Sequence, residues 1–380
     1  MKIVADDKIP FLKGVFEHIA EIKYLSGSSI KKKDILDADA LIIRTRTKCN
    51  KELLAGTSVK FIATATVGFD HLDFLWLEQA GIKWSNAYGC NSGAVCQYIA
   101  AILSLLIKEG INPANKTIGI VGVGMVGSKV EKLAKTLGFN VLLNDPPRAR
   151  KESNSSFVDL QTILKQSDII TFHTPLNFEG IDATYHLFDI DSLDFLKPNS
   201  IIINTSRGDI VSSQALLKGI ESGKISKITI DVWENEPDIS IELLQKVWIA
   251  TPHIAGYSFD GKVNGTAMSV QAISRFFNLG LDNWYPDSLP IPNNNIIRID
   301  ETNKQPFEIA AEAILQTYDI VQDDKCLRAN PEHFKKLQDN YLLRKEFGAW
   351  KIPITTNNSS EILEKLGFII FNRVSKFFFS

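Results

Sequence analysis

Three polar segments in the middle of the chain contain residues that together could oxidise a hydroxy acid. Arg207 stands in NTSRGDIV, Glu236 in DVWENEP and His253 in TPHIAG. A guanidinium can hold a carboxylate with two parallel hydrogen bonds, and an imidazole can take up a proton near neutral pH. A carboxylate beside the imidazole fixes its tautomer and favours its protonated form. Each residue alone is more often structural, but the three together predict a site that orients a hydroxy acid and removes its hydroxyl proton.

A glycine-rich segment, GVGMVG at residues 122–127, predicts a dinucleotide site. An apolar run precedes it and a helical pattern follows it, which is the context that such a segment requires. Gly122 permits a tight turn, Gly124 lets the backbone approach a pyrophosphate, and Gly127 allows close packing of helix on strand. The N-terminus of the helix offers N–H groups and a positive dipole end to the phosphates.

An acidic residue, Asp145, follows the next apolar run, 23 positions after Gly122. A carboxylate at this place accepts hydrogen bonds from the adenosine ribose and repels a 2′-phosphate. The sequence therefore predicts NAD rather than NADP as the cofactor. Arg148 lies nearby and argues in the opposite direction, because a cation favours the phosphorylated form.

The elements that must position these residues alternate between strand and helix, which predicts an α/β fold with parallel sheets. In such sheets ligands bind at the carboxyl ends of the strands, where the loops with Arg207, Glu236 and His253 are expected to lie. Short apolar runs predict strands at residues 2–5, 40–44, 61–64, 117–121 and 140–143, and helical spacing predicts helices at residues 12–20, 92–109 and 125–137.

A Pro- and Asn-rich segment at residues 284–295 indicates a linker, followed by a separate C-terminal unit. The apolar residues 377–379 are expected to pack against another part of the protein. Within the unit we expect strands at residues 295–299, 350–355 and 368–371, and helices at residues 307–321, 331–344 and 361–366.

Composition excludes several classes of protein. The 380 residues include 42 basic and 44 acidic side chains, so the net charge of −2 gives no electrostatic reason to bind nucleic acid or an anionic membrane. The longest apolar run spans about ten residues, whereas a membrane span needs about twenty. Four scattered cysteines and six scattered histidines show no metal-binding spacing. We therefore expect a soluble, cytoplasmic protein without a metal.

The motifs GVGMVG, NTSRGDIV, DVWENEP and TPHIAG, in this order, resemble those of the D-isomer-specific 2-hydroxyacid dehydrogenases. The resemblance implies two doubly wound, Rossmann-like parallel-sheet domains and catalytic roles for Arg207, Glu236 and His253. It also implies a nicotinamide contact from Asp231. The cofactor contacts expected from the glycine loop and the resemblance are Gly122, Gly124, Met125, Val126, Gly127, Asp145, Thr174, Thr205, Ser206, Arg207, Asp231 and Gly256.

A narrower resemblance, to one branch of this family, covers nearly the whole chain through ALIIRTRTKCN, FIATATVGFDHLD, YGCNSGAV, LLNDPPRA and TPHIAGYSFDGK. It implies oxidation of a phosphorylated hydroxy acid in vitamin B6 synthesis and a homodimer formed by a small C-terminal α/β domain. The substrate contacts would fall on Thr45, Thr66 and Tyr257. The domains implied are a substrate-binding domain at 1–92 and 257–284, an NAD-binding domain at 93–256 and a dimerisation domain at 285–380.

Two neighbouring segments could bind the phosphate of such a substrate. Arg44, Arg46 and Lys48 alternate after a predicted strand, so their side chains would point the same way. Arg46 departs from the branch, where a small or apolar residue is expected, and it is either exposed or adds charge near the phosphate. The loop at residues 64–71 offers hydroxyls and backbone N–H groups, although it could equally be a tight turn.

Other functions stay open on the sequence alone. The same chemistry could act on 3-phosphoglycerate or glyoxylate. A regulator that senses NAD, or a structural protein with a vestigial site, could share the fold. Neither of the last two needs an intact set of Arg207, Glu236 and His253.

Overall fold

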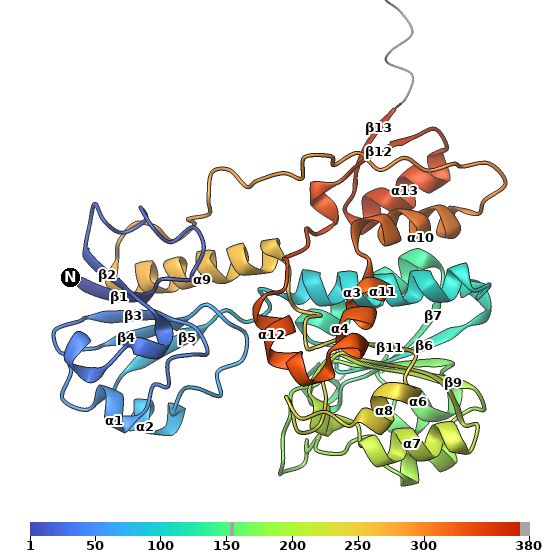
Figure 1. Cartoon of the computed structure of the whole chain (residues 1–380), viewed down its shortest axis with the longest axis horizontal. Helices are drawn as coiled ribbons and strands as arrows, with labels where there is room; N and C mark the ends of the chain where they lie inside the picture. The colour runs from blue at the N-terminus through green and yellow to red at the C-terminus, as the bar shows by residue number, and fades with distance from the viewer. Residues whose placement is uncertain (153–155, 373–380) are drawn as a thin grey trace, which may run out of the picture. The chain divides into compact units, whose positions relative to one another are not determined.

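The computed structural model describes residues 1–152 and 156–372 (Figure 1). Its internal contacts divide the chain into two compact units. The first unit comprises Met1–Asn91 and Ser258–Ile291, and the second comprises Ser92–Tyr257 and the described residues from Pro292 onward.

The first unit is built on a parallel sheet of five strands in the order β2-β1-β3-β4-β5. The central strand β3 and its neighbour β4 are wholly buried, as expected from their largely apolar runs. Helix α9 covers one face and packs on β4 and β5, and its Val270 and Ile273 share an apolar core with residues of β1, β3 and β4. The elements are β1 (Lys2–Asp6), β2 (Glu21–Leu25), β3 (Ala40–Ile43), α1 (Lys51–Leu54), β4 (Phe61–Thr64), α2 (Phe74–Gln79), β5 (Lys83–Asn86) and α9 (Phe259–Phe277).

The prediction of a helix over residues 12–20 is wrong, because the segment between β1 and β2 consists of turns. Phe11 has φ of 60° and Gly14 has φ of 89°, and a left-handed residue interrupts a right-handed helix. Leu12 and Phe16 are nevertheless fully buried. The apolar spacing therefore reflects burial of a turn and not helical periodicity.

The second unit contains a parallel sheet of six strands in the order β11-β10-β9-β8-β6-β7. The chain leaves β6 toward β7 and then returns to β8 on the other side, so the switch point of the topology lies between β6 and β8. The strands are β6 (Thr117–Val121), β7 (Asn140–Asn144), β8 (Ile169–Phe172), β9 (Ser200–Asn204), β10 (Ile225–Ile230) and β11 (Ile249–Ala250). The helices before and between them are α3 (Ser92–Lys108), α4 (Met125–Leu137), α5 (Pro146–Glu152), α6 (Leu160–Gln166), α7 (Ser213–Glu221) and α8 (Ile241–Lys246).

The described C-terminal residues pack on the helices of this second sheet. Helix α10 lies beside α3 (Figure 1), and Ile309 and Ile314 join one apolar core with Ile99 and Leu103. The elements are α10 (Pro306–Thr317), α11 (Ile320–Ala329), α12 (Phe334–Asp339), β12 (Lys351–Ile354), α13 (Asn357–Leu366) and β13 (Ile369–Asn372).

The C-terminal predictions are right in part. The two later strands and the last helix are confirmed. The expected strand at 295–299 is reduced to one bridge between Ile296 and Lys351. The expected helix at 307–321 ends at Thr317. That at 331–344 is confirmed only over 331–339, where a short 3-10 helix (Pro331–His333) leads into α12, and residues 340–344 are not helical. Helix α11 is missed, and residues 377–379 lie outside the described residues.

The predicted α/β class with Rossmann-like parallel sheets is confirmed. The predicted limits of the three domains stay predictions. Within the described part of the chain, no helix combines the length and the hydropathy that crossing a bilayer demands.

Candidate active site

The glycine loop joins β6 to α4 at the switch point of the second sheet, the position where open α/β sheets bind ligands. Gly122 has φ of 86°, and a Cβ there would lie 2.8 Å from the backbone carbonyl group of His173. A Cβ on Gly127 would lie 2.0 Å from the carbonyl oxygen of Gly122. Gly124 begins α4 without a side-chain cap, so the first-turn N–H groups are not used by a capping side chain. This geometry fits a pyrophosphate.

Asp145 follows β7 and faces the same loop. Its Oδ2 accepts a hydrogen bond from the N–H of Val123 at 2.8 Å. The guanidinium of Arg148 is occupied elsewhere, because Nε and Nη2 donate to the Glu152 carboxylate at 2.6 and 3.0 Å and Nη1 donates to the Val123 carbonyl at 2.6 Å. The positive charge of Arg148, which would favour NADP, is thus compensated by Glu152 one helical turn away.

The end of β8 borders the other side of the switch point. The hydroxyl of Thr174 is buried there, and it has no hydrogen-bond partner among the residues that the structure describes. Such an orphan hydroxyl is costly unless a ligand satisfies it, which fits its expected cofactor contact. His173 bridges Thr171 and Thr205 at 3.0 and 3.3 Å. Burial lowers the pKa of His173 to about 3, so its ring stays neutral and serves as a spacer.

His253 and Glu236 form a hydrogen-bonded pair. The distance between His253 Nδ1 and Glu236 Oε2 is 2.7 Å, and Glu236 Oε1 accepts from the N–H of Trp233 at 2.8 Å. Burial lowers the pKa of His253, but the hydrogen bond and charge of Glu236, with Asp231 behind it, outweigh burial and the nearby cation Arg207. The pKa therefore lies above the ordinary value of 6.5.

Asp231 lies beneath the loop that carries His253. Its Oδ1 accepts from the Thr251 hydroxyl and the Ile254 N–H, both at 2.7 Å, and its Oδ2 accepts from the Ala255 N–H at 2.9 Å. Burial raises its pKa, which the His253 charge and these hydrogen bonds oppose. Asp231 thus organises the loop, a role that the sequence pattern did not indicate.

Arg207 follows β9 in a loop packed tightly on the next one. A Cβ on Gly208 would lie 2.1 Å from the backbone of Trp233, so the two loops touch through glycine. Arg207 is partly exposed, and its Nη1 donates to the Ser206 carbonyl at 2.8 Å. The structure brings Arg207, Glu236 and His253 to one edge of the sheet, as we expected from the strand order. Thr205, Ser206 and Gly256 lie in the same loops.

The prediction that Arg44, Arg46 and Lys48 form a one-sided row is wrong. A turn closes after β3, where the N–H of Thr47 donates to the Arg44 carbonyl at 3.2 Å, so side chains two apart do not align. Arg44 instead pairs with the buried carboxylate of Asp6 through Nε and Nη2 at 3.0 and 3.1 Å. Arg46 is exposed, and so is Thr45.

The hydroxyls of Thr64, at the end of β4, and Thr66, in the loop that follows, are both hydrogen-bonded within the first unit. Thr66 Oγ1 lies 2.8 Å from Thr64 Oγ1 and donates to the Gly68 carbonyl at 3.0 Å. Thr66 is half-buried in the first unit. Tyr257, the other expected substrate contact, belongs to the second unit, where its ring centroid lies 6.2 Å from that of Tyr341.

A further cation, Lys262, was not predicted as a site residue. It lies in the first turn of α9, where burial and the neighbouring charge of Arg44 lower its pKa. Two cations therefore stand near each other in the first unit. The signal in the sequence was SFDGK, in which Ser258 caps α9 and Lys262 follows one turn later.

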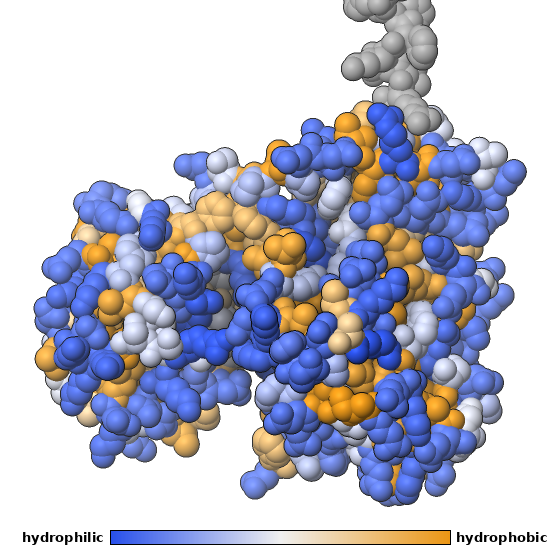
Figure 2. Space-filling model, in the orientation of Figure 1, coloured by the Kyte–Doolittle hydropathy of each residue, from blue (hydrophilic) through white to orange (hydrophobic). Residues whose placement is uncertain are grey.

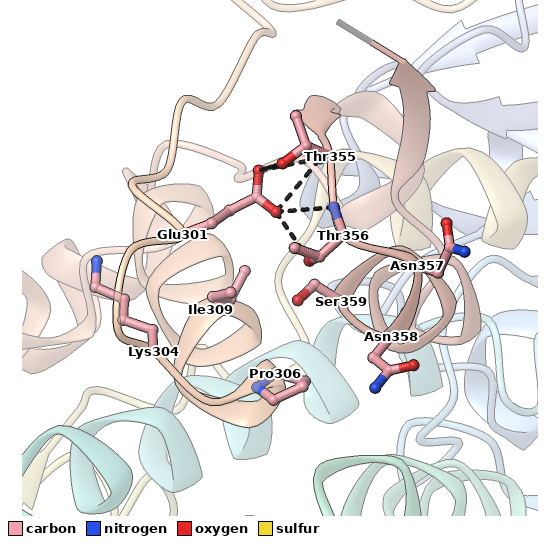
Figure 3. Close-up of a pocket in the computed structure, with 9 residues that line it drawn as sticks. All are labelled: Glu301, Lys304, Pro306, Ile309, Thr355, Thr356, Asn357, Asn358 and Ser359. Carbon is pink, nitrogen blue, oxygen red and sulfur yellow. Dashed lines mark hydrogen bonds between the residues drawn. The ribbon is translucent and has the colours of Figure 1, made fainter.

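The C-terminal residues enclose a separate pocket of about 510 Å³ (Figure 3). Residues 301–309 form one wall and residues 355–359 the other. The Glu301 carboxylate accepts the N–H and hydroxyl groups of Thr355 and Thr356 at 2.9–3.3 Å. Lys304 pairs with Glu312. None of the predicted site residues lines this pocket, and its charged groups are already paired.

Known proteins resemble this chain along most of its length. The family model described as "D-isomer specific 2-hydroxyacid dehydrogenase, NAD binding domain" matches residues 106–255, and a model described as a domain of unknown function matches residues 288–367. Erythronate-4-phosphate dehydrogenase of Bacteroides fragilis is 48% identical over 357 residues, or 93% of this chain and 100% of that protein. The enzyme of the same name from Proteus mirabilis is 41% identical over 97% of this chain and 99% of its own.

The solved structure of D-lactate dehydrogenase from Aquifex aeolicus, complexed with NAD and lactic acid, shares the fold. It has a TM-score of 0.58 and 24% identity, and the match covers 74% of this chain and 97% of that one. The fold, the glycine turn and the matching family model define an NAD-dependent dehydrogenase of the D-isomer-specific 2-hydroxyacid class, with NAD as its cofactor. Within that class, the chain belongs to the erythronate-4-phosphate dehydrogenase family.

Proposed function

We propose that this enzyme oxidises 4-phospho-D-erythronate at C2 to 3-hydroxy-2-oxo-4-phosphobutanoate, as a step of pyridoxal 5′-phosphate (vitamin B6) synthesis in the cytoplasm. The hydrogen-bonded pair of His253 and Glu236 beside Arg207 is the observation that carries the proposed chemistry. The names of the relatives, which match over nearly their full length, support the substrate.

In the proposed reaction Arg207 binds the C1 carboxylate of the substrate and fixes its orientation. Neutral His253 takes the C2 hydroxyl proton on Nε2, because Nδ1 is held by Glu236. Glu236 stabilises the imidazolium that forms. Bound NAD⁺ supplies the acceptor for the hydride that leaves C2. Proton and hydride then have separate destinations, and no metal is required.

The cofactor would lie along the loop of Gly122, Gly124, Met125, Val126 and Gly127. Asp145 would accept from the ribose, and the pairing of Arg148 with Glu152 supports selection against a 2′-phosphate. The buried hydroxyl of Thr174 would gain its missing partner. Further contacts are proposed for Thr205, Ser206, Arg207, Asp231 and Gly256.

The phosphorylated end of the substrate is proposed to bind in the first unit. Thr45 and Thr66 offer hydroxyls there, and Lys262 and Arg44 offer positive charge. Lys262 is proposed as a phosphate contact because an anionic ligand would offset its burial and the neighbouring charge of Arg44. Tyr257 is proposed as a contact from the second unit.

A homodimer through the C-terminal residues is also proposed. Phe368, just before strand β13, is buried, and Ile370 within the strand packs inward, whereas Ile369 and Phe371 are 45% and 40% exposed on the other face. Apolar side chains, drawn in orange, lie over β12 and β13 in Figure 2. A second copy of the chain would cover this face, and exposed apolar strands of this kind pair readily.

The deciding experiment is NADH formation by the purified protein with NAD⁺ and 4-phospho-D-erythronate, beside 3-phosphoglycerate and glycerate. A 2-oxo acid should be present as an electron sink, and NADH already bound should be measured by fluorescence. We expect a clear preference for the erythronate phosphate. If the enzyme oxidised only 3-phosphoglycerate, the proposed roles of the catalytic residues would stand and the proposed substrate would be wrong. No turnover of any of these, with NADH still bound, would favour a regulator that senses NAD.

A further inference from the structure

The loop that carries His253, residues 251–256, is fixed by its backbone on two sides. On one side all three N–H groups of His253, Ile254 and Ala255 donate to Asp231. The His253 N–H bonds to the backbone carbonyl of Asp231 at 2.7 Å, and the other two bond to its carboxylate at 2.7 and 2.9 Å. Asp231 directly follows β10, the strand beside β11 in the second sheet.

On the other side, all three carbonyls of the same residues accept from the C-terminal part of the chain. The Gln338 Nε2 donates to the His253 carbonyl at 3.1 Å. The Arg344 guanidinium donates to the Ile254 carbonyl from Nη1 at 3.2 Å and to the Ala255 carbonyl from Nη2. These two side chains follow the loop by 85 to 90 residues, beyond the Pro- and Asn-rich linker.

Arg344 is 8% exposed and uses all five of its N–H donors. Besides the two loop carbonyls, it bonds to the Gln97 side chain at 3.1 Å, the Ala94 carbonyl at 2.9 Å and the Tyr341 hydroxyl at 3.2 Å. All five acceptors are uncharged. A buried cation held by neutral dipoles is costly, and only the planar fork of arginine matches this set of acceptors.

The conformation of the loop needs such support. His253 has φ of 57°, in the left-handed region that residues other than glycine rarely adopt. Strained backbone of this kind persists when its surroundings determine it. With this backbone conformation, His253 Nδ1 lies 2.7 Å from Glu236 Oε2.

We infer that Arg344 and Gln338 are positioning residues for His253, so that the C-terminal part of the chain holds the general base in its working orientation. This inference rests on the proposed function, in which His253 accepts the substrate proton. The charged groups that face the ring are Glu236, Asp231 and Arg207. Gln338 is uncharged and Arg344 reaches the loop through carbonyls, so both act on the ring through geometry.

The test compares Arg344→Lys and Gln338→Met with a matched control, Arg328→Lys, in the full-length enzyme. Arg328 also follows the linker and donates to backbone carbonyls at the C-terminal end of α8, those of Leu244 and Val247, but it does not contact the His253 loop. The readouts are kcat, KM for 4-phospho-D-erythronate, the pH dependence of kcat, NADH affinity and the thermal midpoint.

We expect Arg344→Lys to lower kcat about 10–100-fold, because misplacing a reacting group by about 1 Å costs this much. The pH–rate midpoint should fall toward that of an ordinary histidine as the bond to Glu236 loosens, while NADH affinity stays within about twofold. Gln338→Met should act in the same direction with a smaller effect. Arg328→Lys should lower the thermal midpoint and leave kcat and the pH midpoint unchanged.

The inference fails if Arg344→Lys and Gln338→Met lower only the thermal midpoint, as the control does. Should the wild-type enzyme turn over no hydroxy acid, the proposed function fails instead. In that case NMR titration of [¹³Cε1]histidine-labelled protein, with the His253 signal assigned from His253→Gln, still tests the positioning. A His253 pKa that is lower in Arg344→Lys than in the wild type supports it, and an unchanged pKa overturns it.

Discussion

At the scale of single residues, the proposed chemistry depends on which protonation state His253 holds. Oxidation needs the neutral ring, because the proton must move from the substrate to Nε2. Reduction of the keto acid needs the protonated ring. Glu236 raises the pKa of His253 above 6.5 against the effect of burial, so the pair favours the form that serves reduction.

Replacing His253 by glutamine should abolish the proton transfer without removing the loop from its place. We expect turnover to fall about 10²–10⁴-fold, the range typical of a general base. NADH binding, measured by fluorescence, should stay within about threefold because the glycine loop is untouched. Turnover close to that of the wild type would remove His253 from the proposed mechanism.

The pH dependence follows from the sign of the His253 shift. Because the raised pKa keeps the ring protonated above pH 6.5, kcat for oxidation should rise with pH through a midpoint above 6.5. Glu236→Gln removes the charge and keeps the shape, so the midpoint should move to lower pH, together with a lower kcat at the plateau. A midpoint that does not move would show that another group controls the profile.

Lys262 offers a test of where the substrate phosphate binds. Burial and Arg44 lower its pKa, so the amine gains from an anionic ligand. Lys262→Met should raise KM for 4-phospho-D-erythronate about tenfold or more, the loss expected for one charge-assisted contact. The kcat/KM for unphosphorylated D-erythronate should change little. Equal losses with both substrates would exclude a specific phosphate contact.

At the scale of elements, the turn from β6 to α4 was predicted residue by residue. The strand at 117–121 and the helix at 125–137 have the predicted bounds because Gly122 and Gly138, both at positive φ, mark the ends unambiguously. The segment at 12–20 failed for the converse reason, since Gly14 at φ of 89° breaks an apparent helical repeat. Local backbone geometry decides such segments, and spacing alone does not reveal it.

The close packing of this turn leads to a prediction. A methyl group on Gly127 would lie 2.0 Å from the Gly122 carbonyl oxygen, so Gly127→Ala must push α4 away from β6. We expect a thermal midpoint several degrees lower and NADH binding weaker by about tenfold or more. Gly348→Ala is the matched control, since its Cβ would meet only one atom, at 3.9 Å. Equal effects of the two substitutions would argue against the packing role.

The candidate site was predictable in its residue types but not in its support. Strand order alone brings Arg207, Glu236 and His253 to one edge. Arg344 and Gln338 donate their hydrogen bonds to backbone carbonyls. Because every residue has a backbone carbonyl, no pattern of residue types in the sequence predicts these bonds. Side-chain contacts to backbone across 85 to 90 residues depend on how the parts dock, and the pattern of one chain does not contain that information.

At the scale of the whole molecule, the C-terminal residues have two faces with different partners. One face packs on α3 and on the His253 loop, as the shared core and the bonds of Arg344 show. The other face includes Ile369 and Phe371 on β13, which are 45% and 40% exposed. If a second copy covers this face, dimerisation and support of the general base reside in the same short segment.

The dimer can be tested by placing charge on the exposed face of β13. Light scattering of the wild type should give about twice the chain mass of 42.4 kDa. The double substitution Ile369→Lys with Phe371→Lys should give a monomer, because two buried cations in an apolar interface cost more than the contact gains. The control is Ile181→Lys. Ile181 is 86% exposed and lies between β8 and β9 of the second sheet, so this variant should stay a dimer. A dimer that survives the double substitution would place the interface elsewhere, and the inward face of the segment would then act on His253 independently of assembly.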